Sequence, residues 1–218
     1  MKNILKSLLA VAAIAGATVA QAVSIPPAGS VDLSGTPYSA SGGGEFLAEV
    51  AGYPSFYTFC VQRYETLTSE LPGTFDYTIA STTSVGTHPS SIPNNTIKEG
   101  TSYLYRMFLA GTLYDLGDVV SRKANSISLQ KAIWELQGVG AGLGQNAGNN
   151  VFLGMVYGLF GEAGAKATTS DVTVKVMRIW GPQGEDLQDV LVYVPDSGAT
   201  LALLGLGLAG LMVARRRR

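Results

Sequence analysis

The sequence predicts a β-rich α+β fold, in which a single antiparallel β domain carries one or two helical inserts. Three observations lead to this prediction. Apolar and polar residues alternate in short segments such as Phe75 to Ile79 and Val172 to Val176, which is the period of a half-buried strand. In two other segments the apolar residues recur at helical spacing. Apolar runs at both ends of the chain predict a signal peptide and a C-terminal transmembrane helix that flank the domain.

Residues 1–22 have the three parts of a secretory signal peptide. Lys2 and Lys6 make the first part positive, an apolar run follows, and Ala20 and Ala22 stand where signal peptidase cleaves an A-x-A sequence. An uncleaved N-terminal anchor is the alternative, but the apolar run is short for a membrane span. We therefore expect export and removal of this segment.

Composition limits what the rest of the chain can do. Without the two terminal signals about 170 residues remain, enough for one domain with its own core. The formal net charge is −1, and removal of the six basic residues of the signals (Lys2, Lys6 and Arg215 to Arg218) leaves −7. An acidic body argues against nucleic acid as a partner. One histidine and one cysteine cannot form a structural zinc site, so we expect no metal and no cofactor.

The mature chain divides into three parts. Residues 23–44 contain three prolines and three successive glycines and are predicted to form a linker or irregular arm. Residues 45–193 form the β-rich extracellular domain, which includes a long polar surface loop over 81–95. A last strand over 190–194 leads into the C-terminal signal, residues 194–218.

Two helical segments are predicted inside the domain. The first covers Thr101 to Leu113. In the second, apolar residues recur at i, i+3, i+4 and i+7, as expected for one face of a helix packed on a core. These residues are Leu129, Ala132, Ile133 and Leu136. The N-cap is expected at Ser126 or Ser128 and the end of the helix at Gly138.

The C-terminal segment combines a polar motif, an apolar run and a basic end. The motif is Val194, Pro195, Asp196, Ser197 and Gly198; the apolar run covers 199–214; the basic end is Arg215, Arg216, Arg217 and Arg218. A helix over the apolar run is about 24 Å long, which makes it a minimal span for a hydrocarbon core of about 30 Å. The arginines act as a stop-transfer signal and favour the cytoplasmic side, so the motif and the body should face outward. A plain membrane anchor preceded by an ordinary turn is the alternative.

This tail resembles the PEP-CTERM class of sorting signals in its Val-Pro-Asp-Ser-Gly variant. The resemblance covers Val194 to Arg218 and departs from the commoner Pro-Glu-Pro form in having Asp196 as the acid and no second proline. It implies transient insertion into the inner membrane of a Gram-negative bacterium and recognition by an exosortase. It further implies cleavage near the motif and a final place at the cell surface or outside the cell. It does not imply that the chain is itself an enzyme.

Cys60, the only cysteine, lies in a strand predicted over Phe56 to Tyr64. No intrachain disulfide can form, so an unpaired thiol in an exported protein needs another explanation. Three remain open. Cys60 is a small buried hydrophobic residue, or it forms a disulfide with another molecule, or it forms a thioester with the side-chain amide of a glutamine. Gln130 and Trp134 lie on a helical stripe next to the apolar one and enter the third explanation.

Two short windows resemble the motifs of bacterial thioester domains, Phe59-Cys60-Val61-Gln62 and Leu129-Gln130-Lys131-Ala132-Ile133-Trp134. In that family an aromatic-Cys-aliphatic strand meets a Leu-Gln-x-Ala-Ile-Trp helix, and the cysteine and the glutamine join as a thioester that captures amines on surface ligands. The resemblance implies Cys60 as the thiol, Gln130 as the acyl donor and Trp134 as part of a shielding wall. No neighbouring base can be identified from the sequence, because the only histidine, His88, lies in the polar loop.

Three functional classes follow for the body. It is an adhesion module for a surface polysaccharide or an amine-bearing ligand, a passive component of an exopolysaccharide matrix, or, less favoured, an unrecognised secreted hydrolase. No catalytic residues and no phosphate-binding loop are expected, because the glycine-rich segment 140–148 lacks the lysine and the strand-loop-helix frame of such a loop. A thioester would separate the first class from the others.

Overall fold

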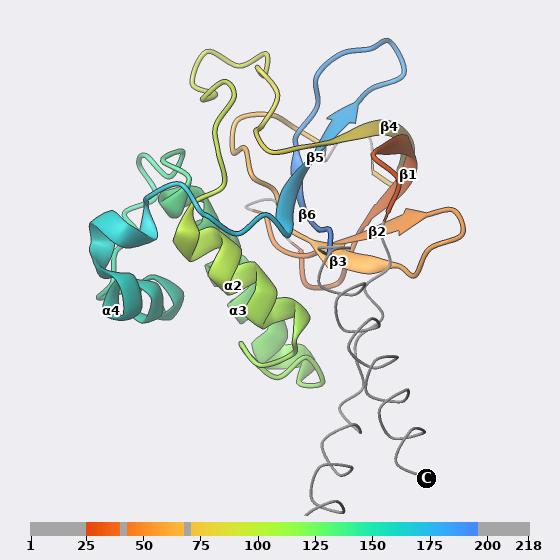
Figure 1. Ribbon diagram of the computed structural model, residues 1–218. Helices are drawn as coiled ribbons and strands as arrows, with labels where there is room; N and C mark the ends of the chain where they lie inside the picture. The colour runs from red at the N-terminus through yellow and green to blue at the C-terminus, as the bar shows by residue number, and fades with distance from the viewer. Residues whose placement is uncertain (1–24, 40–42, 68–70, 196–218) are drawn as a thin grey trace, which may run out of the picture.

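The computed structural model describes residues 25–39, 43–67 and 71–195, and its centre is a six-stranded sheet (Figure 1). Every pair of neighbouring strands is antiparallel, in the spatial order β3-β2-β1-β4-β5-β6. The strands are β1 Ala28–Gly35, β2 Phe46–Val50, β3 Phe56–Thr58, β4 Gly73–Ala80, β5 Val174–Trp180 and β6 Val190–Tyr193. The prediction of an antiparallel, β-rich domain is confirmed.

The sheet curls until its two edges meet. Directly after β3, Cys60 forms an antiparallel bridge with Val190 of β6. On either side of this bridge the Val61 N–H donates to the Asp189 carbonyl at 2.9 Å, and the Leu191 N–H donates to the Phe59 carbonyl at 3.0 Å. The sheet is therefore nearly closed, and both edge strands lose part of the unpaired backbone that an open edge would expose.

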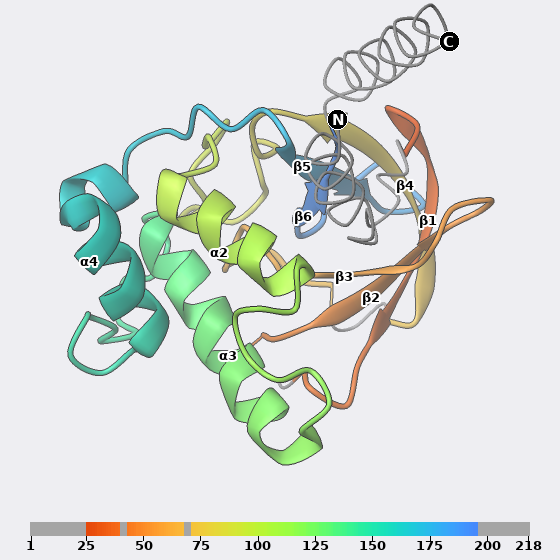
Figure 2. The same ribbon diagram turned by 60° about the horizontal axis from the view of Figure 1, so that its bottom comes forward.

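Three helices lie together on one side of the sheet in the part of the chain that is described (Figures 1 and 2). They are α2 Glu99–Leu109, α3 Val119–Leu136 and α4 Val151–Ala165. The first two correspond to the two predicted helical segments. The third was not predicted, because four glycines lower its helix propensity. Burial of Phe152, Leu153 and Val156 against the other helices stabilises it nevertheless.

Helix α3 begins earlier than the sequence suggested. Asp118 is its N-cap and accepts hydrogen bonds from the backbone N–H groups of Val120 and Ser121. The predicted caps, Ser126 and Ser128, lie inside the helix, and neither cap prediction holds. The carboxylate of Asp118 is a stronger partner for the exposed N–H groups, and its pKa is lowered by these hydrogen bonds. The predicted end is confirmed, since the helix stops at Leu136 just before Gly138.

Two hydrophobic clusters form the core. One lies between the helices and the sheet and includes Leu129 and Ile133 of α3. The other lies on the inner face of the curled sheet and includes Val31, Cys60 and Trp134. Helix α3 contributes to both, so the predicted apolar stripe and the stripe beside it are each buried. This double burial fixes the rotation of α3 about its axis.

The prediction of an irregular arm over 23–44 is wrong for Ala28–Gly35. These residues form β1, which lies between β2 and β4 in the sheet. Val31 and Leu33 are fully inside, alternating with polar neighbours as in a half-buried strand. Prolines before and after the strand favoured the prediction of an irregular arm and obscured this short alternation. None of them lies within the strand itself, so they do not interrupt its pairing.

The membrane-related predictions fall mostly outside the described residues. Within the described part of the chain, no helix combines the length and the apolar character that crossing a bilayer requires. The predicted span over 199–214, the arginines Arg215 to Arg218 and the signal peptide with Ala20 and Ala22 all lie outside the described ranges.

Candidate functional site

One face of α3 makes a row of polar connections to the strands. Its four members follow one another at intervals of four residues, so they share a stripe of the helix. They are Arg122, Ser126, Gln130 and Trp134. The first two bind Glu45 beside the start of β2, the third binds Cys60, and the fourth binds Gln62. The helix is thus tied to two segments, at Glu45 and at Cys60 to Gln62, that lie 70 or more residues before their helix partners in the sequence.

Gln130 and Cys60, the two residues of the predicted thioester, are in direct contact. The Cys60 N–H donates to Gln130 Oε1 at 2.9 Å, and Gln130 Nε2 donates to the Cys60 carbonyl at 2.7 Å. Gln130 is 0% exposed and Cys60 is 1% exposed. The helix and strand motifs therefore meet in the structure at the residues that the sequence singled out.

The bridge between Cys60 and Val190 explains why a glutamine is needed here. In this bridge the hydrogen bonds across to β6 are made by Val61 and Phe59, so the N–H and carbonyl of Cys60 point away from β6. Buried backbone groups without partners would cost free energy. The amide of Gln130 has one donor side and one acceptor side, and it satisfies both groups at once.

The same two hydrogen bonds fix the orientation of the Gln130 amide. The Cys60 N–H points at Oε1, where negative charge would develop if a nucleophile added to Cδ. The carbonyl of Cys60 holds Nε2, the group that would leave. Trp134 packs in the same cluster as Cys60, and its Nε1 donates to the Gln62 carbonyl at 3.1 Å. The Gln130 amide is therefore buried and held in one orientation by the backbone of Cys60.

The environment of the Cys60 thiol favours its protonated form. Burial raises its pKa well above the ordinary value, and the nearby negative charge of Asp189 raises it further. Asp189 is a residue that sequence reasoning missed; it directly precedes β6 and is 0% exposed. Its carboxylate accepts hydrogen bonds from the backbone N–H of Ser84 at 2.6 Å and of Ile179 at 3.3 Å. A lone aspartate between Gln188 and Val190 gives no sequence signal for such a place.

Burial also raises the pKa of Asp189, to about 7, although its hydrogen bonds and the charge of Arg178 act in the opposite direction. From the ordinary value of 3.8 up to about 7, the folded chain holds a proton that the unfolded chain has lost. The free energy of unfolding should therefore fall as pH rises through this window, by about 1.4 kcal/mol for each unit of pKa difference. Asp189→Asn should flatten this dependence, as measured by urea unfolding at about pH 5 and about pH 8.

The control for this prediction is Asp171→Asn. The pKa of Asp171 is lowered by hydrogen bonds from Thr173 and Ser102 and by Arg106, which together outweigh its partial burial. Its contribution to stability is present above the ordinary aspartate pKa and is lost only as pH falls below it. Asp171→Asn should lower the free energy of unfolding by the same amount at both pH values. The pH dependence of the free energy of unfolding should therefore stay that of the wild type. If the free energy of unfolding of Asp189→Asn depends on pH as it does in the wild type, Asp189 does not titrate in this window.

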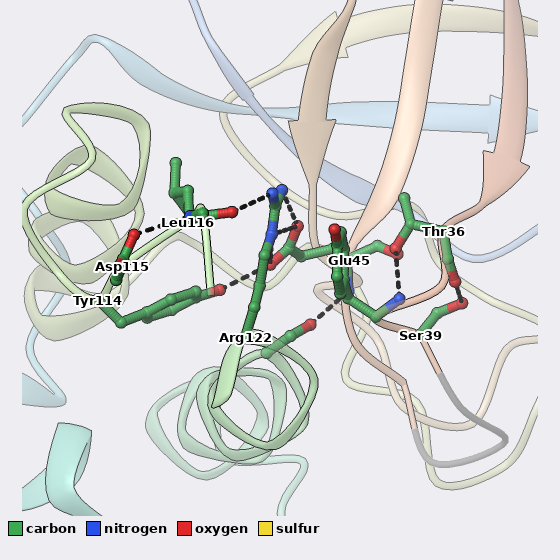
Figure 3. A network of polar contacts seen from close by, with 10 residues as sticks. Thr36, Ser39, Glu45, Tyr114, Asp115, Leu116 and Arg122 are labelled. Atoms are coloured by element: carbon green, nitrogen blue, oxygen red, sulfur yellow. Dashed lines mark hydrogen bonds and ion pairs between the residues drawn. The ribbon is translucent and has the colours of Figure 1, made fainter. Parts of the chain in front are cut away.

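Glu45 and Arg122 form a buried ion pair at one end of the α3 stripe (Figure 3). Arg122 donates from Nη2 to Glu45 Oε2 at 2.7 Å and from Nε to both carboxylate oxygens, and Tyr114 Oη donates to Oε1 at 2.9 Å. The guanidinium also lies over the rings of Tyr38 and Tyr57, 4.1 and 4.8 Å from their centroids. This network fixes the chain just before β2 against α3.

The remaining candidates are placed as follows. His88 is exposed in the loop, as predicted, and stacks on the ring of Tyr64. Cys60 is too deeply buried for a disulfide to a second molecule without opening the fold, which argues against that explanation. Among the described residues, no group of three His, Cys, Asp or Glu side chains could hold a metal ion.

Two residues of the sorting motif are described. Val194 continues directly from β6, and its N–H donates to the Thr173 carbonyl at 2.7 Å. Pro195 follows and is half-buried. Asp196, Ser197 and Gly198 lie outside the described residues. The motif therefore begins where the folded body ends, without an intervening linker.

Comparison with protein-family models gives a match to the VPDSG-CTERM motif over residues 193–218. The C-terminal segment is therefore a sorting signal of the PEP-CTERM type, which supports an exported chain that passes through a membrane and is processed by an exosortase. Comparison with curated proteins gave no match, and comparison with solved structures gave none either.

Proposed function

We propose that this chain is a Gram-negative surface protein sorted by an exosortase, whose body captures an amine-bearing ligand through a thioester between Cys60 and Gln130. The observation that carries the proposal is the paired hydrogen bond between the Gln130 amide and the Cys60 backbone. It brings the acyl donor to the residue that bears the only thiol of the chain. On this proposal the body acts once per molecule and is not a turnover enzyme.

The bond-forming step balances without any further reactant. Cys60 Sγ bonds to Gln130 Cδ, the bond from Cδ to Nε2 breaks, and the thiol proton leaves with the nitrogen as ammonia. The Cys60 N–H stabilises the charge that develops on Oε1 during the step. The thiol must lose its proton first, a loss that burial and the charge of Asp189 both oppose, since both raise the pKa of Cys60. An incoming primary amine would then form an amide with Cδ and return the thiol.

A passive matrix component is the second candidate, and one observation favours it. The Gln130 amide already satisfies two buried backbone groups, and burial keeps the Cys60 thiol protonated. On this reading both residues have only a structural role. The Gln130 amide then replaces a neighbouring strand as the hydrogen-bond partner of the Cys60 backbone, where the sheet closes. The two candidates differ in whether ammonia is lost from the chain.

Intact mass of the purified mature protein separates these candidates. If the thioester forms, the wild type should weigh one ammonia less than its sequence, resist alkylation and take up methylamine with release of a free thiol. Cys60→Ala and Gln130→Ala should each abolish methylamine uptake. The matched control is Gln137→Ala at the C-cap of the same helix, since Gln137 is also buried but bonds to Thr101 rather than to Cys60. A wild-type mass equal to the plain sequence, with alkylation of Cys60 once the protein is unfolded, would leave the passive role.

A further inference from the structure

Gly43 lies directly against the Gln130 amide. A Cβ placed on Gly43 would be 3.2 Å from Gln130 Cδ and 2.9 Å from Cη2 of Trp134, and it would overlap Gln130 Cγ. A nucleophile that attacks a carbonyl carbon must first reach about 3–3.5 Å from it. The backbone of Gly43 therefore occupies space next to Cδ through which water or an amine could approach.

The segment from Gly43 to Glu45 is held in this place from the α3 side. The Glu45 N–H donates to Ser126 Oγ at 2.8 Å, one helical turn before Gln130. Its carboxylate binds Arg122 one further turn away, and its carbonyl accepts from Thr36 Oγ1 at 2.9 Å. Figure 3 shows Glu45 between Arg122 and Thr36. The backbone and the side chain of Glu45 are thus held by separate partners.

We infer that Gly43 to Glu45 form a cover that shields the Cys60–Gln130 pair from solvent, and that the Glu45–Arg122 ion pair anchors this cover. The inference rests on the proposed function for its chemical consequence. With a thioester present, the cover slows the reaction in which water bonds to Cδ, the bond from Cδ to Sγ breaks and the thiol regains its proton. Capture of an amine then requires displacement of the cover, so a ligand must engage this segment before it reacts.

Gly43→Ala tests the cover, and Gly52→Ala is its matched control. Both glycines have positive φ, +96° and +83°, so alanine strains the backbone similarly at both. Only at Gly43 would the new methyl group meet Gln130, because nothing lies within 4 Å of a Cβ at Gly52. In Gly43→Ala the cover should be displaced, and the thioester should hydrolyse at least about tenfold faster, the factor that corresponds to about 1.4 kcal/mol of barrier.

Mass spectrometry over time reads out this hydrolysis as a product with the mass of a Gln130→Glu chain. Wild type and Gly52→Ala should retain the ammonia-loss mass long after Gly43→Ala has been converted. The melting temperature should fall further in Gly43→Ala, because only there does the methyl group meet Gln130 and Trp134. Hydrolysis is therefore compared at a temperature at which both variants remain folded, which separates shielding from stability. Equal hydrolysis in both glycine variants would overturn the inference while leaving the thioester in place.

A second pair of variants tests the anchor. Arg122→Lys retains the charge but loses the forked contact with Glu45, whereas Arg106→Lys makes the same change in the exposed pair with Asp171. Only Arg122→Lys should accelerate hydrolysis. If the wild type shows no ammonia loss, the proposed function fails, and the alkylation rate of Cys60 in the same four variants reports the shielding directly. Faster alkylation in Gly43→Ala and Arg122→Lys alone would support the cover, and equal rates in all four would overturn it.

Discussion

Replacement of Pro195 and Gly198 by alanine is expected to leave export intact and to hold the chain at the membrane with its tail attached. The segment that contains both residues is a VPDSG-CTERM motif, and an exosortase should no longer recognise it. The body should still fold, because Pro195 has no N–H to contribute and the last backbone bond of the body is made by Val194. Membrane fractionation with intact mass of the released protein measures the effect, which should be complete loss of the trimmed form.

A matched control is available in the loop between β5 and β6. Pro182 and Gly184 are exposed there, and nothing lies within 4 Å of a Cβ at Gly184. Their replacement by alanine makes the same chemical change close to β6 but outside the motif. This control should be trimmed and released like the wild type. If the Pro195 and Gly198 variant is also released and trimmed, the motif does not direct processing.

Glu45→Ala is expected to lower the free energy of unfolding by about 3–5 kcal/mol, the cost of leaving a buried charge without its partner. The side chains of Glu45 and Arg122 are 0% and 8% exposed, so water cannot replace the lost carboxylate around the guanidinium. Tyr114 would lose its acceptor at the same time. Urea unfolding of the purified mature protein measures the change.

Two comparisons show whether this loss comes from the unpaired charge. The double variant Glu45→Leu with Arg122→Met removes both charges and should be more stable than Glu45→Ala, because no buried ion remains. Arg106→Ala breaks the exposed pair with Asp171 and should cost less than about 1 kcal/mol. A loss below about 1 kcal/mol for Glu45→Ala itself would mean that water reaches Arg122 and that the pair is not a rigid anchor.

The sequence alone was sufficient to predict a structural feature wherever that feature depends on a local pattern of residues. The spacing of Leu129, Ala132, Ile133 and Leu136 identified the buried face of α3, because helical geometry alone decides which residues share a face. The sorting motif was recognisable because an exosortase reads a short, contiguous segment. Windows around Cys60 and Gln130 could be paired only through their resemblance to a known family. Nothing in their own spacing shows that residues 70 positions apart are in contact.

The sequence by itself determined the antiparallel β-rich class, the packing face of α3 and the C-terminal signal. Only the tertiary structure decided that the sheet closes through Cys60 and Val190, that Asp189 is buried beside the thiol and that Gly43 covers Gln130. The physical reason is the range of the interactions. Periodicity reflects burial along one element, whereas closure of a sheet, the pKa of a buried acid and the covering of an amide each depend on segments that meet only after the chain has folded.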